Sequence, residues 1–148
     1  MRIMGLDYGD KAIGVAASDS LGLIAQGVTT IRRDNENSFK KLIRELSEII
    51  SEYKIEKIVL GFPKNMDNSQ GVRCEKTLAF KERLERNFKR IPVVLWDERL
   101  STVAAGQILK EAGIKREKRN MVIDMSAAVY ILQGYLDSIT NKKEKTNE

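Results

Sequence analysis

The sequence predicts an α/β domain in which helices cover a mixed β-sheet. Two observations lead to this prediction. Three strand-like segments joined by short turns come first, and helices then alternate with short apolar strands. Short turns favour antiparallel pairing, whereas strands separated by helices pair in parallel. The 148 residues are most simply accommodated in one domain, which is long enough to bury a sizeable core.

The first three strands are predicted from apolar runs bounded by turn residues. RIMGLDY (2–8) is followed by the turn Gly9–Lys11, then by AIGVAAS (12–18). After a loop at 19–23, GVTTIR (27–32) supplies the third strand. These spacings favour an antiparallel meander.

Helical periodicity begins after the meander. Apolar residues recur at spacings of three and four over 39–53, which predicts a helix with one buried face. These residues are Phe39, Leu42, Ile43, Leu46, Ile49, Ile50 and Tyr53. KIVLGFP (57–63) and IPVVLWDER (91–99) are typical of buried strands, and a charged helix is predicted between them over 73–89.

Two more helices are predicted in the last third of the chain. Ser101 or Thr102 can cap the first, which ends near Gly113. The basic segment KREKR (115–119) is predicted to be a loop before a last helix over 121–139. We therefore expect a single domain over 1–139 and a disordered tail over 140–148.

The composition limits the class of protein. It is 42% hydrophobic and 32% charged, as in soluble globular domains. There is no membrane-length apolar run and no signal-peptide pattern, and the single cysteine, Cys74, cannot form an internal disulfide. We expect a cytoplasmic protein with no membrane partner.

The chain contains no histidine, which excludes several kinds of active site. Ser-His-Asp and Cys-His nucleophiles, histidine acid–base catalysis and histidine-bound zinc are all ruled out. An enzyme built from this sequence has to use carboxylates, lysines, hydroxyls or a metal bound through oxygen. The net charge of +5 is compatible with a polyanionic partner.

Three acids fall where such an enzyme would need them. Asp7 lies near the end of the first strand, Glu98 directly follows VVLW, and Asp124 lies at the start of the last helix. Ligands bind at the carboxyl edge of parallel strands, and Ala127 and Ala128 would let that helix approach the sheet. Clustered carboxylates repel one another unless cations lie between them, and oxygen ligands suit Mg²⁺ or Mn²⁺. Two such ions, about 4 Å apart, can promote phosphodiester hydrolysis.

Each acid also has a purely structural interpretation. Asp7 could form a turn or cap a helix, and Asp124 could simply stabilise a helix N-terminus. Glu98 could pair with Arg99, and its neighbour Asp97 competes for the same role. The residues alone leave these alternatives open.

Four motifs in order resemble the YqgF (RuvX) family. They are GLDYGDKAIGVAASD, VLGFPKNMDNSQG, WDERLST and VIDMSAAVYILQGYLD, and the resemblance covers residues 1–137. It implies an RNase H-like fold with strand order 3-2-1-4-5, in which only the second strand is antiparallel. It also implies a nuclease with Asp7, Glu98 and Asp124 as catalytic acids and metal ligands, acting with Mg²⁺ or Mn²⁺.

The sequence departs from the family pattern at two positions. Ala12 stands where an arginine is usual, and Asn68 where a glycine is common. The strand expected beside the first one ends in Gly61-Phe62-Pro63, without an acid. Asp67, in the loop that follows, is therefore a rival to Glu98 as second ligand.

Four basic residues in or near the motifs are candidates for nucleic-acid binding: Lys11, Lys64, Arg73 and Arg99. Each could instead be an ordinary solvated charge. KREKR could clamp nucleic acid or remain a solvated loop.

The resemblance favours 5′ end processing of pre-16S rRNA in ribosome biogenesis by a monomer or weak homodimer. The alternatives are a Holliday junction resolvase acting on four-way DNA, and a non-catalytic ribosome assembly factor. The opening motif also resembles the phosphate loop of sugar-kinase and actin-like ATPases, but those proteins need two such domains.

Overall fold

The computed structural model describes residues 1–35, 38–62, 72–97 and 116–146. Side-chain surroundings are described for these residues except 72, 116–124 and 141–146. The helix predicted over 101–113 lies outside the described residues. The strands are β1 (Arg2–Tyr8), β2 (Ala12–Ser18), β3 (Ala25–Arg32), β4 (Ile55–Phe62) and β5 (Val93–Asp97), and the helices are α1 (Phe39–Tyr53), α2 (Val72–Asn87) and α4 (Arg116–Thr146).

The strands form one mixed sheet in the order β3-β2-β1-β4-β5. β2 pairs antiparallel with both β1 and β3, whereas β1, β4 and β5 pair in parallel. The predicted sheet order, with only the second strand antiparallel, is confirmed. It makes β1 the central strand, with Asp7 near its carboxyl end.

The helix α1 has the predicted bounds, and its residues Leu42, Leu46 and Ile49 are buried. The last helix is longer than predicted at both ends. It begins at Arg116, so the expectation of a loop over KREKR was wrong from that residue on. It continues to Thr146 and so includes 140–146, most of the segment predicted to be a disordered tail. Arginine, lysine and glutamate are good helix formers, so a run of charges without glycine or proline can continue a helix.

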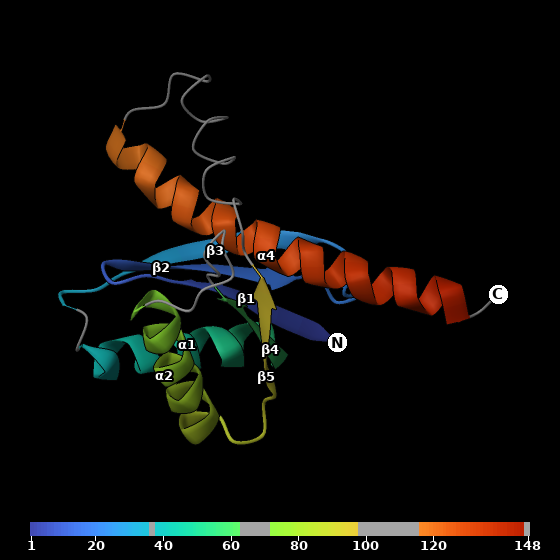
Figure 1. Cartoon of the computed structure of the whole chain (residues 1–148), viewed down its shortest axis with the longest axis horizontal. Coiled ribbons are helices and arrows are strands. Elements are labelled where there is room, and N and C mark those ends of the chain that lie inside the picture. The colour runs from blue at the N-terminus through green and yellow to red at the C-terminus, as the bar shows by residue number, and fades with distance from the viewer. Residues whose placement is uncertain (36–37, 63–71, 98–115, 147–148) are drawn as a thin grey trace.

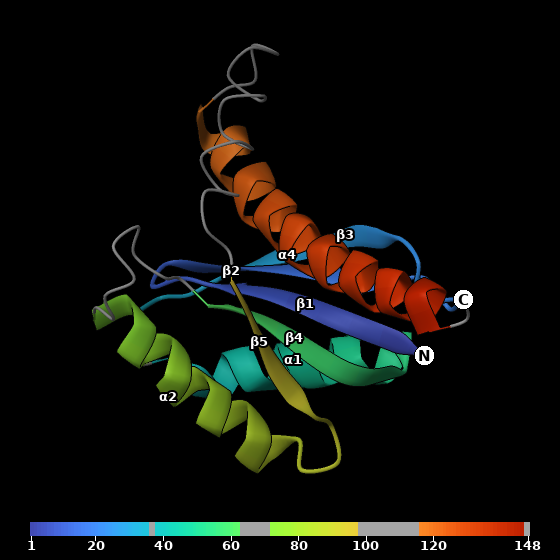
Figure 2. The same cartoon turned by 45° about the vertical axis from the view of Figure 1, so that its right-hand side comes forward.

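Helices cover both faces of the sheet, as Figures 1 and 2 show, with α1 and α2 on one face and α4 on the other. Met4, Leu6 and Tyr8 of β1 belong to the core beneath α1 and α2. Ile3 belongs to the core beneath α4, with the buried α4 residues Ala128, Ile131, Leu132 and Leu136. Alternate residues of β1 therefore face different layers.

The α4 helix lies very close to the sheet at Gly5. A Cβ atom on Gly5 would lie 2.7 Å from Leu132 Cβ and 3.1 Å from the carbonyl oxygen of Ala128. Ala127 and Ala128 are fully buried, as expected for small residues at a close approach. The helix position is thus fixed by contacts that only small side chains permit.

Within the described part of the chain, no helix combines the length and apolar character needed to cross a membrane.

Candidate active site at the end of β1

Asp7 is the next-to-last residue of β1 and is only 6% exposed. Leu6 and Tyr8 on either side belong to the core beneath α1 and α2. Because neighbours along a strand face opposite ways, Asp7 is on the α4 face. Tyr8 is on the face away from Asp7. Its ring stacks on Phe80, with centroids 4.3 Å apart.

Glycines occupy the positions beside Asp7 on both neighbouring strands. Asp7 is aligned with Gly14 of β2, and on β4 Gly61 follows Leu60, the partner of Leu6. Neither glycine places a side chain next to the carboxylate. This part of the sheet can therefore accommodate a ligand beside Asp7 that bulkier neighbours would exclude.

The α4 helix passes over β1 in the opposite direction to the strand. The chain's N-terminus and the C-terminal end of α4 lie at the same end of the molecule (Figures 1 and 2). Ala128 and Leu132 lie over Gly5, and position 124 is one helical turn before Ala128. Asp124 is therefore in the part of α4 that extends toward the carboxyl end of β1, although its side-chain position is not described.

Asp97, the last residue of β5, can be assigned to a face of the sheet from the residues before it. Val93 and Leu95 contact the core beneath α1 and α2, whereas Val94 and Trp96 contact the core beneath α4. By alternation, the exposed Asp97 at the end of β5 is on the face away from Asp7. This position does not support Asp97 as a partner of Asp7.

Several predicted site residues lie outside the described residues: Glu98, Lys64, Asp67 and Arg99. The strand order places β5 two strands from β1, a separation of about 10 Å. Within the described part of the chain, no three potential metal ligands gather in one place. Asp7 itself is a carboxylate donor of the kind that Mg²⁺ and Mn²⁺ prefer. The complete set of three acids stays a prediction.

The turn after Asp7 is tightly built. A Cβ atom on Gly9 would lie 2.7 Å from the carbonyl oxygen of Ala12, so the turn itself requires this glycine. Arg33 is 9% exposed and donates a hydrogen bond of 2.9 Å from one terminal nitrogen to the Gly9 carbonyl oxygen. Its guanidinium carbon lies 5.0 Å from the ring centroids of both Tyr8 and Phe39. Arg33 therefore holds the turn that follows Asp7.

Replacing Arg33 by alanine is expected to lower the free energy of unfolding by about 1.5–3 kcal/mol, because a charged hydrogen bond and the packing of two rings are lost. Urea denaturation measures this loss. Arg32→Ala is the matched control, because Arg32 is exposed on the preceding position and its loss is expected to change stability by less than about 0.5 kcal/mol. Equal losses of unfolding free energy in the two variants would contradict the role of Arg33 in holding the turn after Asp7.

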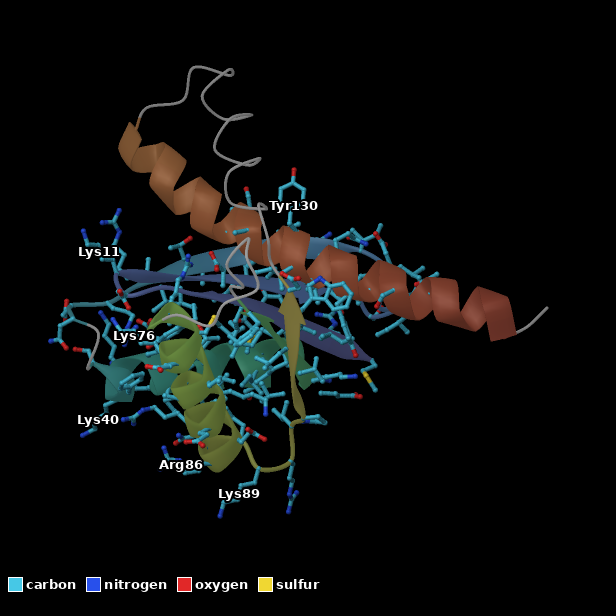
Figure 3. The ribbon with its side chains drawn as sticks, viewed as in Figure 1. Lys11, Lys40, Lys76, Arg86, Lys89 and Tyr130 are labelled. Carbon is cyan, nitrogen blue, oxygen red and sulfur yellow. The ribbon has the colours of Figure 1, made fainter. Side chains whose placement is uncertain are left out.

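The described basic candidates lie beside this turn. Lys11 is exposed directly before β2, and Arg73 is exposed in the first turn of α2. Lys76, one helical turn further, forms an ion pair with Asp10. Figure 3 shows Lys11 and Lys76 at the same end of the molecule. Neither Arg33 nor Lys76 was predicted from the sequence. The i, i+3 spacing of Arg73 and Lys76 places them on one face of the predicted helix, but it does not reveal the contact of Lys76 with Asp10.

Comparisons with known proteins agree with this architecture. Residues 1–138 match the family model described as "RuvX: Holliday junction resolvase". A "Putative pre-16S rRNA nuclease" of Bacillus pumilus is 55% identical over 139 residues, which cover 94% of this chain and 99% of that protein. A protein of the same name from Desulfitobacterium hafniense is 50% identical over 148 residues, with full coverage of both chains.

A solved structure of Thermus thermophilus RuvC in complex with a Holliday junction substrate also resembles the chain. It has a TM-score of 0.59 at 15% sequence identity, covering 95% of this chain and 96% of that one. At this identity the likeness concerns the fold alone. Together with the sheet order, it identifies the fold as RNase H-like, as the sequence predicts.

Proposed function

Because the chain belongs to the RuvX family, we propose that it is a metal-dependent endonuclease that hydrolyses phosphodiester bonds in structured nucleic acid. The observation that carries this proposal is the position of Asp7. A carboxylate that is 6% exposed lies at the carboxyl end of the central strand, with glycines at the neighbouring positions. Burying a carboxylate is costly, and binding a cation there offsets the cost.

The proposed ligands are Asp7, Glu98 and Asp124, holding Mg²⁺ or Mn²⁺, with two ions when substrate is bound. A bound divalent ion supplies Lewis-acid stabilisation of the charge that develops on the phosphate oxygens. The chain supplies rigidity, because Asp7 is on a strand paired on both sides and α4 is fixed against Gly5. Rigid elements hold reacting groups more accurately than loops do.

The proposed substrate is the 5′ end of pre-16S rRNA. Relatives that are half identical over nearly the whole chain carry the name of this activity. The net charge of +5 suits a polyanionic substrate. The proposed place of action is the cytoplasm, since a processing enzyme has to meet rRNA precursors where ribosomes are assembled.

The test is cleavage of an end-labelled RNA that carries a pre-16S 5′ leader, with Mg²⁺ or Mn²⁺. Wild type is compared with Glu98→Gln and Asp124→Asn, each checked for folding by circular dichroism. Discrete cuts that disappear in both variants and in EDTA are expected. If Glu98→Gln still cut, Asp67→Asn would be the next variant to test. A folded wild type that bound the RNA and never cut it would replace the nuclease with a non-catalytic assembly factor.

A second candidate, resolution of Holliday junctions, is favoured by the description of the family model. Cutting a four-way junction symmetrically needs two active sites, and hence a dimer of suitable spacing. Light scattering gives the oligomeric state, and a synthetic four-way DNA junction gives the activity. We expect a monomer or weak homodimer that prefers the RNA; a stable dimer that makes paired cuts in the junction would reverse this preference.

A further inference from the structure

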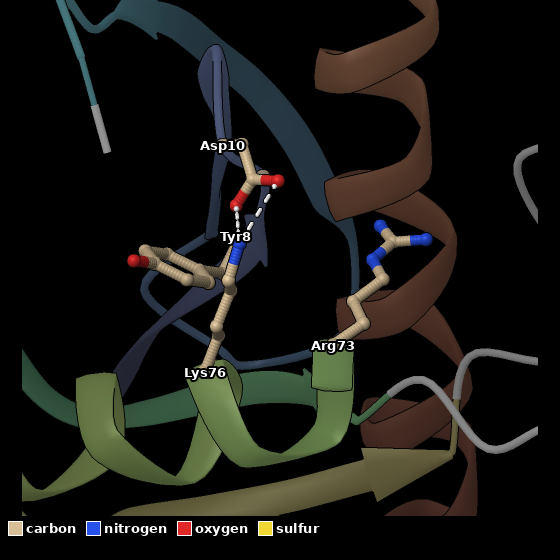
Figure 4. Close-up of a pocket in the computed structure, with 5 residues that line it drawn as sticks. Tyr8, Asp10, Arg73 and Lys76 are labelled. Carbon is tan, nitrogen blue, oxygen red and sulfur yellow. Dashed lines mark hydrogen bonds and ion pairs between the residues drawn. The ribbon is translucent and has the colours of Figure 1, made fainter. Parts of the chain in front are cut away.

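A pocket of about 310 Å³ opens on the opposite side of the β1 end from Asp7. It is lined by Tyr8, Gly9, Asp10, Arg73 and Lys76. The first three follow Asp7 directly in the chain, and the other two come from α2. Figure 4 shows Lys76 reaching from α2 to Asp10, with Arg73 extending from the same helix beside it. The pocket thus lies at the same end of β1 as the candidate active site, but on the α2 side of the sheet.

The residues that line this pocket carry more positive than negative charge. Arg73 and Lys76 are positive and Asp10 is negative, so the lining carries one net positive charge. Lys76 Nζ lies 3.4 Å from Asp10 Oδ1 and 3.5 Å from Oδ2. Both side chains are substantially exposed, at 36% and 57%. An exposed ion pair of this kind contributes little to stability, so exchanging the carboxylate for another anion costs little.

The base of the pocket is rigid. Tyr8 is stacked on Phe80, the turn at Gly9 leaves no room for a Cβ atom beside the Ala12 carbonyl oxygen, and Arg33 donates to the Gly9 carbonyl oxygen. An anion bound here would be held at a fixed place relative to Asp7. Three residues of extended chain span at most about 10 Å, which corresponds to the axial rise of roughly three nucleotides in one strand.

We propose that this pocket binds a backbone phosphate of the nucleic-acid substrate, within about three nucleotides of the phosphate at Asp7, through Arg73 and Lys76. Asp10 acts as the counter-ion that the phosphate displaces from Lys76. The displaced carboxylate stays nearby and repels any anion in the pocket. A small anion has nothing to offset this repulsion, whereas a polyanion is also held by contacts elsewhere, so the pocket favours the polyanion. This inference rests on the proposed function and deepens it by assigning a substrate contact to Lys76 and a selective role to Asp10.

The test measures the salt dependence of RNA binding in EDTA, where no cleavage occurs. The affinity for the pre-16S leader RNA is determined between 50 and 200 mM KCl. Each phosphate contact contributes about 0.7–0.9 to the slope of log affinity against log salt. Lys76→Ala is expected to lower the slope by this amount, so that the affinity lost over the fourfold salt range shrinks by about threefold. Asp10→Asn is expected to tighten binding at 50 mM KCl.

The α2 helix offers a matched control in Lys81, which pairs with Glu85 at 2.9 Å. Lys81→Ala removes the same charge and also breaks an ion pair on the same helix, but it lies outside the pocket. Its slope is expected to equal that of the wild type. Equal slopes for Lys76→Ala and Lys81→Ala would overturn the proposal. They would mean that the lysines of α2 attract RNA only through their general positive potential, without a specific phosphate contact at Lys76.

The remaining outcomes separate this inference from the proposed function. RNA that binds and is cut, with a slope unchanged by Lys76→Ala, would overturn the phosphate subsite and leave the nuclease. RNA that binds with the expected slope change and is never cut would overturn the nuclease and leave the subsite. Inorganic phosphate is the second probe. If it stabilised wild type but not Lys76→Ala against heat, while the RNA slopes stayed equal, the pocket would take a small anion instead.

Discussion

Replacing Asp7 by asparagine is expected to reduce RNA cleavage by more than about 100-fold, since the loss of outer-shell partners of a metal site alone costs 10–100-fold. Asparagine has nearly the same shape but lacks the charge needed to hold a cation. The fold is expected to persist, because the variant no longer buries a carboxylate in a site that is 6% exposed. Cleavage of the leader RNA and circular dichroism measure the two effects.

The same variant tests whether Asp7 binds a metal ion or has only a structural role. A ligand present at 100 times its dissociation constant stabilises a protein by about 2.7 kcal/mol. Millimolar Mg²⁺ or Mn²⁺ is therefore expected to raise the melting temperature of the wild type and to have a smaller effect on Asp7→Asn. Equal shifts in both proteins would contradict metal binding by Asp7.

Asp19→Asn provides the control for this substitution. Asp19 directly follows β2, beside the start of β1 and so at the other end of the strands from Asp7. Its carboxylate accepts a hydrogen bond of 2.8 Å from the Leu23 backbone N–H. Asparagine can keep that hydrogen bond through its own oxygen, so cleavage is expected to be unchanged.

Asp97→Asn tests Asp97, the acid at the end of β5 that competes with Glu98 as second ligand. If it abolished cleavage and Glu98→Gln did not, the assignment of the second ligand would be wrong.

Replacing Gly5 by alanine is expected to lower the free energy of unfolding by about 1–3 kcal/mol, the usual cost of overpacking a core. The new Cβ would lie 2.7 Å from Leu132 Cβ and 3.1 Å from the Ala128 carbonyl oxygen. Neither atom is at the end of a flexible side chain, so α4 has to move away from the sheet. Cleavage is also expected to fall, because the same helix carries Asp124. Urea denaturation and the leader-RNA assay measure the two losses.

Gly27→Ala, on β3, is the matched control, because its new Cβ would also face α4. Its new Cβ would meet Met125, at 2.7 Å from Cγ and 2.8 Å from Sδ. Methionine has several rotatable bonds and adapts to irregular space, so a smaller loss is expected. Adding Met125→Ala is expected to recover part of it. If Gly5→Ala were as stable as the wild type, the close contact of α4 with β1 would not control the position of the helix.

The sequence was sufficient to predict the parts of the fold that depend on local pattern. The bounds of α1 followed from the spacing of its apolar residues, and the antiparallel pairing of the first three strands from their short turns. The N-terminal extension of α4 was missed because the charges at 116–119 were interpreted as a solvated loop, although these residue types also favour helices.

The missed site residues depend on neighbours that are far away in the chain. Arg33 contacts the Gly9 carbonyl oxygen, 24 positions earlier, and Lys76 contacts Asp10, 66 positions earlier. No local spacing reveals such contacts, because they arise only when the sheet brings β1, β3 and α2 together. Asp7 could be identified as a candidate because a lone acid in an apolar strand is conspicuous in the sequence itself.

The distance along the chain between β1 and α4 also determines when the site can form during synthesis. Ribosomes make a protein from its N-terminus, and β1 to β3 emerge within the first 32 residues. The face of β1 that carries Asp7 is covered by α4 residues between 127 and 136, which are made about a hundred residues later. A growing chain therefore exposes Asp7 without its covering helix for most of its translation. An enzyme of this design would complete its carboxylate site only near the end of synthesis, once α4 has been made.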